Sequence, residues 1–285
     1  MVLLIVPLSA FALNLAEPPD YLKSWQRIKG EVDGSETLYH FTGKLYSYVP
    51  GEKRMELFDI EGYNVSRILP AEEDKEGFRL LAKEVVLFKD PNTGEVLEHW
   101  RNPFTGRSLP VIHVFNDPVN QDYQFSPEYL PYIRHILPST DLGERIVFHQ
   151  ELFPFMENPM NRKEYGDFVQ SDILQMGDFL QYTVSKTDLE NEDLAFLPVE
   201  LYRTQIFPWL PFMRMADRAG ELIMVSRGKK LAGGFAALPE NIKDFVMKRK
   251  PEYAQAPDFE AEDNTNSWNY FKRLYDQSVE ERSEP

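Results

Sequence analysis

A histidine and a carboxylate stand two residues apart at His149 and Glu151, in a segment whose β-branched and aromatic residues predict a strand. Residues two apart on a strand share one face, so both side chains would point the same way. Such a pair suits proton transfer or two of the ligands of a divalent metal, and the alternative is an ordinary strand face. A metal would need further ligands, and the nearest candidates are His99, His113, Asp117 and Glu98.

A second polar group lies on both sides of a turn at Gly106. If the two flanking strands pair through this turn, His99 and Arg101 lie on one face and His113 faces them across the ladder. The alternative is turn chemistry, since Asn102 and Asp117 each precede proline, where such side chains cap turns. The acid–base candidates here are His113 and Asp117, and the substrate-binding candidates are His99, Trp100, Arg101, Asn116 and Asn120.

A third group is the aromatic and methionine-rich stretch 206–220, which is interrupted by two prolines. It could line an apolar pocket with Trp209, while Arg214 and Arg218 offer planar guanidinium groups to an anion. The alternative is a core segment whose arginines pair locally with Asp217. Both interpretations stay open at the level of sequence.

Several classes of chemistry are excluded by what the 285 residues lack. There is no cysteine, hence no disulfide, thiolate zinc site or cysteine nucleophile. Phosphate-binding, dinucleotide-binding, α/β-hydrolase and zincin motifs are also missing. The formal net charge of −15 repels nucleic acid and anionic membranes, but an acidic balance alone identifies no substrate. We expect a small-molecule ligand, with no cofactor indicated and the oligomeric state open.

The elements that must position these residues are mostly strands. Alternating and β-branched patterns predict strands at 37–49, 54–60, 63–69, 78–89, 95–101 and 109–115, and again at 145–155, 179–186, 200–207 and 222–227. A turn at 90–94 predicts a hairpin between the fourth and fifth of these. Segment 116–141 is expected to be irregular, as a lid would be.

Helices are expected mainly near the C-terminus, where the apolar spacing changes to that of a helix at 239–249 and 267–277. A short helix is expected at 21–28. Residues 1–12 combine an apolar run with small residues before Ala12, which predicts the remnant of an export signal, although a basic segment is lacking. We therefore expect an exported, periplasmic or extracellular protein.

Three strings make the sequence similar to a known family: DPNTGEVLEHWRNPFTG at 90–106, HVFNDPVN at 113–120 and PWLPFMRMADR at 208–218. They resemble the domain of unknown function DUF1838, and the resemblance spans most of residues 25–257. It implies a single domain and frequent export, and it supplies no activity or catalytic residue.

We expect a mainly β fold, an antiparallel β-barrel or curved sheet of the calycin-like kind with C-terminal helices, and a two-sheet sandwich as the alternative. Residues 13–285 would form one β-rich domain with a helical annex at about 239–277.

Two functions are compatible with this fold. One is a small-molecule lyase, isomerase or hydrolase that uses His113, Asp117, His149 and Glu151 for proton transfer. The other is a non-catalytic barrel that encloses an aromatic or lipid-like molecule. The residues that would contact that molecule are Trp100, Trp209, Phe212 and Met213.

Overall fold

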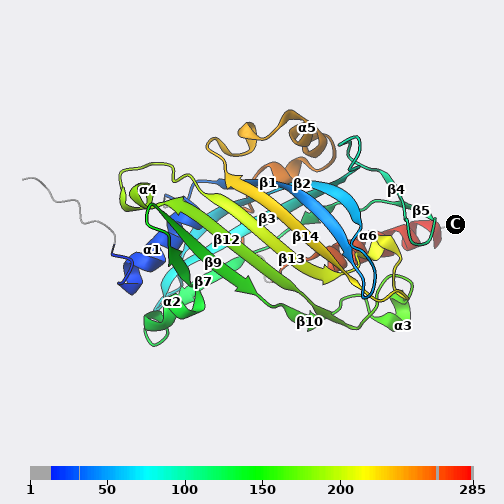
Figure 1. Ribbon diagram of the computed structural model, residues 1–285, viewed down its shortest axis with the longest axis horizontal. Helices are drawn as coiled ribbons and strands as arrows, with labels where there is room; N and C mark the ends of the chain where they lie inside the picture. Colours follow the sequence, from blue (N-terminus) through cyan, green and yellow to red (C-terminus); the bar gives the residue numbers. More distant parts are fainter. Residues whose placement is uncertain (1–13, 32, 261–262, 284–285) are drawn as a thin grey trace, which may run out of the picture.

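The structure is a computed structural model that describes residues 14–31, 33–260 and 263–283 (Figure 1). The expected export segment lies outside the described residues. One ten-stranded antiparallel sheet dominates, in the order β6-β3-β2-β1-β14-β13-β12-β9-β8, with β7 also beside β3. Its strands are β1 (Thr37–Tyr48), β2 (Glu56–Pro70), β3 (Glu76–Lys89), β6 (Val114–Asn116), β7 (Gln121–Phe125), β8 (Ser139–Asp141), β9 (Arg145–Leu152), β12 (Gly177–Ser185), β13 (Glu200–Pro208) and β14 (Glu221–Lys230).

Smaller elements surround this sheet. Two short hairpins are β4 (His99–Arg101) with β5 (Ser108–Pro110), and β10 (Phe155–Glu157) with β11 (Ile173–Gln175). The α-helices are α1 (Pro18–Lys29), α2 (Ile133–Ile136), α3 (Arg162–Tyr165), α4 (Lys186–Glu190), α5 (Glu240–Arg249) and α6 (Ser267–Ser283). The 3₁₀ turns are η1 (Leu130–Tyr132), η2 (Pro211–Met213), η3 (Gly234–Ala237) and η4 (Pro251–Ala254).

The large sheet is open and strongly curved. Strands β3 and β13 are separated by β2, β1 and β14, so in a flat sheet they would lie about 19 Å apart. Nevertheless Nη1 of Arg203 on β13 lies 3.1 Å from Oε1 of Glu84 on β3, which requires the sheet to bend around this face. The two ends of the strand order do not pair within the described residues. The mainly β prediction is therefore confirmed as one antiparallel sheet, whereas a closed barrel and a two-sheet sandwich are not observed.

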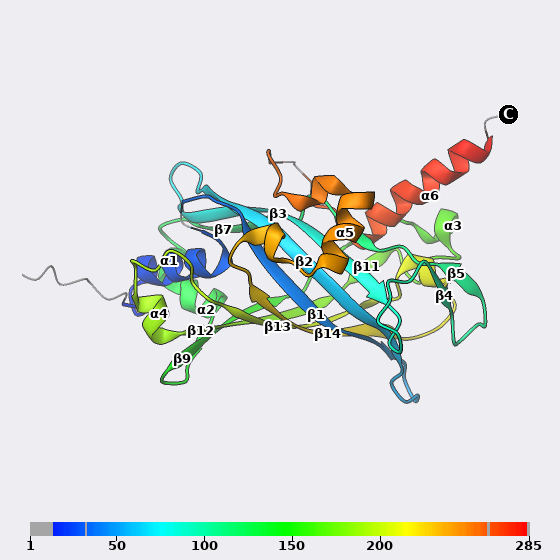
Figure 2. The same ribbon diagram turned by 90° about the horizontal axis from the view of Figure 1, so that it is seen from above.

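Strand alternation gives the sheet a convex and a concave face. On β3, Val85 and Leu87 point to the convex face, where they pack with Ile242 and Val246 of α5 and with η4. Figure 2 shows α5 lying over β1, β2 and β3. Val86 and Phe88 point instead to the concave face. The concave face is the one that can enclose a ligand.

Both ends of the concave face are filled by other elements. At one end α1, which begins with proline in its first turn, inserts Tyr21, Trp25 and Ile28. At the other end the start of α6 packs Trp268 and Phe271 with residues of η2 and of the β4–β5 hairpin. The apolar interior is thereby divided into two clusters with space between them.

Several predicted elements differ from the structure, among them the strand 109–115, which is divided into β5 and β6. Segments 54–60 and 63–69 form the single strand β2, because Gly62 lets the neighbouring chain approach: an added Cβ would lie 2.3 Å from the carbonyl oxygen of Val85. The expected hairpin of 78–89 with 95–101 is reduced to a bridge between Lys89 and Val96, since β4 pairs with β5. Segment 116–141, expected to be irregular, contains β7, η1, α2 and β8.

The expected helices at 21–28, 239–249 and 267–277 are present as α1, α5 and α6. No helix in the described ranges is both long enough and apolar enough to cross a membrane.

Candidate ligand-binding site

A charged network crosses the concave face between the two apolar clusters. Arg203 donates to both carboxylate oxygens of Asp178: from Nε to Oδ1 at 2.9 Å and to Oδ2 at 3.2 Å, and from Nη2 to Oδ2 at 2.7 Å. Its Nη1 donates to Glu84 at 3.1 Å. Burial disfavours the charge of Arg203, but Asp178 and Glu84 outweigh this effect and raise the pKa of the guanidinium. Arg203 therefore remains a cation that holds two carboxylates and three strands together.

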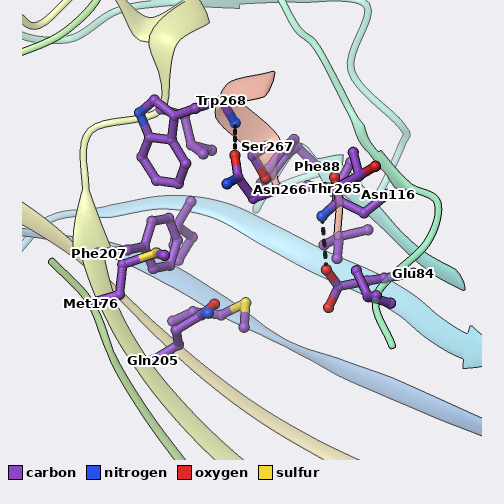
Figure 3. A pocket seen from close by; sticks show the side chains of 16 residues that line it. Glu84, Phe88, Asn116, Met176, Gln205, Phe207, Thr265, Asn266, Ser267 and Trp268 are labelled. Carbon is purple, nitrogen blue, oxygen red and sulfur yellow. Dashed lines mark hydrogen bonds between the residues drawn. The ribbon is translucent and has the colours of Figure 1, made fainter. Parts of the chain in front are cut away.

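The first cavity has a volume of about 160 Å³ and lies between the concave face and the start of α6. Figure 3 shows Trp268 and Phe207 on one side of it and the Glu84–Asn116 pair on the other. Its other apolar lining residues include Leu45, Val86, Phe88, Val114, Met176, Leu210 and Met224, and its other polar ones are Gln205, Thr265, Asn266 and Ser267. The cavity is thus mostly apolar, with the Glu84–Asn116 pair on one side.

The α6 wall of this cavity is held by local hydrogen bonds. Oδ1 of Asn266 accepts from the backbone nitrogens of Trp268 at 2.9 Å and Asn269 at 3.1 Å, which caps the start of the helix. The backbone nitrogen of Thr265 donates to the carbonyl of Pro118 at 2.7 Å. These contacts fix where Trp268 enters the cavity.

Asn116 carries an unsatisfied acceptor at the polar side of the cavity. Its Nδ2 donates to Oε2 of Glu84 at 3.1 Å, and because a carboxylate only accepts, the amide nitrogen must face Glu84. This orientation leaves Oδ1 of Asn116 buried and without a hydrogen-bond partner among the described residues. Leaving such an oxygen unpaired costs about 1–3 kcal/mol, which a ligand with a donor group would recover.

A second cavity of about 140 Å³ lies beyond Glu84, and Glu84 and Val119 line both cavities. The amine of Lys29, at the end of α1, lines this second cavity. Its Nζ lies 2.7 Å from the hydroxyl of Tyr182 and 4.6 Å from the centre of that ring. Burial lowers the pKa of Lys29 to about 7, and the positive charge of Arg203 acts in the same direction.

Among the predicted site residues, Asn116 lines the first cavity. His113 lies under α5 instead: its Nδ1 accepts from the backbone nitrogen of Phe88 at 3.2 Å, and its ring meets Phe245 edge-on at 5.3 Å. Burial, followed by the charge of Arg249, lowers the pKa of His113 to about 4. His113 therefore is a neutral acceptor at neutral pH.

The expectation that His99 and Arg101 face His113 across a ladder is wrong. In the β4–β5 pair, His99 lies opposite Pro110 and Arg101 opposite Ser108, and both side chains are exposed. Strand β5 ends at Pro110 and β6 begins only at Val114, so the β4–β5 ladder ends too early to include His113.

The other acid–base candidates have separate partners. Asp117 pairs with Lys83 at 3.4 Å. His149 and Glu151 share one face of β9, as predicted, but this face is opposite to the buried Phe148 and Gln150. His149 contacts the hydroxyl of Thr140 at 3.1 Å.

Within the residues that the structure describes, no three histidine or acidic side chains gather in a way that could hold a metal ion.

The remaining predicted binding residues make contacts with other residues of the fold. Trp100 packs on Phe58, and Oδ1 of Asn120 accepts from the backbone of Ala82 at 3.2 Å. Trp209 is buried and donates to the carbonyl oxygen of Arg218 at 3.1 Å. Phe212 and Met213 are buried in the same apolar cluster.

The two arginines of segment 206–220 bind distant partners. The guanidinium of Arg214 lies 3.7 Å from the centre of the Phe168 ring and pairs with Asp167. Arg218 pairs with Glu52 and stacks on Phe104. The alternative of local ion pairs with Asp217 is therefore not observed for either arginine in the part of the chain that the structure describes.

Five residues central to the two cavities were not predicted: Lys29, Glu84, Asp178, Tyr182 and Arg203. The sequence of β3 contained a signal for Glu84: it lies an even number of residues from Leu80 and Val86, so its side chain shares their face of the strand. An ionisable residue on an otherwise apolar strand face must find a partner when that face is buried.

Comparison with known proteins gives a family without a described activity. The family model for "Protein of unknown function (DUF1838)" matches residues 34–275. No curated protein matches the chain.

Proposed function

Because the chain belongs to the DUF1838 family, whose description states no activity, we propose a function from the geometry of the site: the protein binds a small aromatic molecule with a hydrogen-bond donor, such as a phenol or aryl alcohol, in the first cavity. The observation that carries this proposal is the buried, unpaired Oδ1 of Asn116, a residue that lines a mostly apolar cavity.

The size of the cavity supports a single-ring ligand. Apolar cavities of roughly 150 Å³ in proteins accept benzene, and this one has about 160 Å³. The rings of Phe207 and Trp268 offer an aromatic wall opposite the Glu84–Asn116 pair (Figure 3). A donor on the ligand would reach Asn116 while its ring contacts the apolar wall.

Together with this function we propose a calycin-like fold, because a sheet curved around its ligand suits a binding function. The curvature required by the Arg203–Glu84 contact supports it. The enzyme hypothesis built on His113, Asp117, His149 and Glu151 is not used, because the first three contact separate partners and Glu151 is exposed on β9.

The test is calorimetric titration of the full chain with phenol and with toluene. Phenol is expected to bind saturably and more tightly than toluene, by about fivefold, since one added hydrogen bond contributes about 1 kcal/mol. Asn116→Leu removes the acceptor and should bring the two affinities together.

Two substitutions on adjacent residues of β14 separate cavity binding from surface binding. Met224 lines the cavity, whereas Val225 is exposed on the other face. Met224→Trp should fill the cavity and abolish binding, and Val225→Trp should leave it unchanged. The proposal fails if neither probe binds the wild-type protein, or if Met224→Trp binds phenol as well as wild type does.

A further inference from the structure

Lys29 is a buried amine that the proposed ligand site does not use. We propose that the second cavity is a covalent site in which Nζ of Lys29 condenses with a small uncharged aldehyde or ketone to form an imine. This goes beyond the binding proposal, because it concerns another cavity and another chemistry.

The geometry places a nucleophile beside a proton donor in an enclosed space. Nζ of Lys29 lies 2.7 Å from the hydroxyl of Tyr182 and 3.5 Å from the side-chain oxygen Oε1 of Gln150. Lys29 is 5% exposed and lines a cavity of about 140 Å³. That volume is sufficient for a carbonyl compound of a few heavy atoms.

The groups around Lys29 leave its amine reactive. Asp178 on β12 attracts a charge on Lys29, but this carboxylate is already held by hydrogen bonds from Arg203 on β13. Arg203 itself repels a charged Lys29. Burial is the larger effect, and together with Arg203 it lowers the pKa of Lys29 to about 7, so that much of the amine is neutral at neutral pH. A neutral amine is the form that attacks a carbonyl carbon.

The remaining titratable groups nearby are tyrosines from three strands and Glu84 from β3. The hydroxyl of Tyr39 on β1 donates to the carbonyl oxygen of Ile28, and that of Tyr123 on β7 contacts Gln150 at 3.1 Å. Burial raises the pKa of Tyr39, Tyr123 and Tyr182, so their hydroxyls stay protonated. Tyr182 therefore keeps a neutral hydroxyl, which can pass its proton to one neighbour only as it takes a proton from another.

The reaction balances without an oxidant or reductant. The lone pair of Nζ forms the C–N bond, while the carbonyl π electrons move to oxygen, which takes a proton from the hydroxyl of Tyr182. One of the two protons on the nitrogen then returns to Tyr182, which leaves a neutral carbinolamine. The hydroxyl of the carbinolamine departs as water with the second proton of the nitrogen, while the nitrogen lone pair forms the C=N bond. One amine and one carbonyl compound thus yield one imine and one water.

The charge of the cavity favours an uncharged substrate. Glu84 and Asp178 line it together with Arg203, so two carboxyl groups and one guanidinium stand beside the amine of Lys29. Arg203 already donates to both carboxylates, so it offers little to an anionic ligand.

The test is reductive trapping on the full-length wild-type protein. Propanal and sodium cyanoborohydride are added at pH 7, and peptide mapping by mass spectrometry follows the reduced adduct at each lysine. Adduct at Lys29 is expected at least about tenfold faster than at Lys23, an exposed lysine of ordinary reactivity on the same helix.

Two matched variants complete the test. Lys29→Arg keeps a cation and should remove the fast adduct, whereas Lys23→Arg should leave it unchanged. Adduct confined to exposed lysines, or formed at Lys29 only after unfolding in urea, would overturn the inference. The wild-type peptide map decides this even if a variant fails to fold, and it is independent of whether phenol binds the first cavity.

Discussion

Replacing Lys29 by methionine should change how the stability of the protein depends on pH. Methionine has a similar length and no charge, so it removes the titration while keeping most of the packing around Tyr182. The hydrogen bond to the Tyr182 hydroxyl is lost as well, but its contribution of about 1 kcal/mol varies little with pH. The pH-dependent part of the difference therefore reports on Lys29 alone.

The magnitude follows from the pKa of Lys29 in the two states. It is about 7 in the folded protein and 10.5 when the chain is unfolded, so between these values the unfolded state holds more protons. The free energy of unfolding then rises with pH by up to about 1.4 kcal/mol per pH unit. Stability is lost as the pH falls from 10.5 to 7 and is lowest below 7.

Urea unfolding of both proteins at pH 7, 8 and 9 measures this effect. From pH 7 to pH 9 the wild-type protein should gain about 2 kcal/mol relative to Lys29→Met. Other titrating groups are common to both proteins and cancel in the difference. Lys23→Met, at an exposed lysine, should show no such trend. A difference between wild type and Lys29→Met that stays constant across this range would refute a buried amine with a lowered pKa.

Two further substitutions test the network and the convex face. Arg203→Met leaves Glu84 and Asp178 buried without their cation. The free energy of unfolding should therefore fall by about 3–5 kcal/mol in urea unfolding. A loss below about 1 kcal/mol would show that this contact does not hold the curved sheet. The pKa of His113 is about 4 when folded and 6.5 when unfolded, so wild type should lose about 3 kcal/mol as the pH falls from 6.5 to 4. His113→Phe should abolish that part of the acid dependence in melting experiments, and an unchanged acid profile would contradict the burial of His113 beside Phe88.

Much of the secondary structure was predictable because it depends on local patterns. Segments 78–89, 179–186 and 200–207 alternate or carry β-branched and aromatic residues, and each is a strand in the structure. The helices at 239–249 and 267–277 show apolar residues at helical spacing. The break after Pro110 and the continuation through Gly62 were not predictable, because each depends on the neighbouring strand.

The candidate site was predictable only in part. Asn116 was selected for its place in a polar stretch, and it lines the first cavity. His113, from the same stretch, lies on the opposite face, since consecutive residues near a strand alternate and the ladder begins only at Val114. Residues that are close along the chain, such as His113 and Asn116, were therefore grouped in one predicted site although they lie on two faces of one sheet.

The sequence by itself determined which side chains share a strand face: Glu84 with Val86 and Phe88, and Arg203 with Phe207. Only the tertiary structure decided that Glu84 and Arg203 meet, although 119 residues and three intervening strands separate them. The physical reason is that strand order and curvature arise from long-range pairing, such as that of β1 with β14, which no local pattern specifies. The cavities, the lowered pKa of Lys29 and the unpaired oxygen of Asn116 all follow from that curvature.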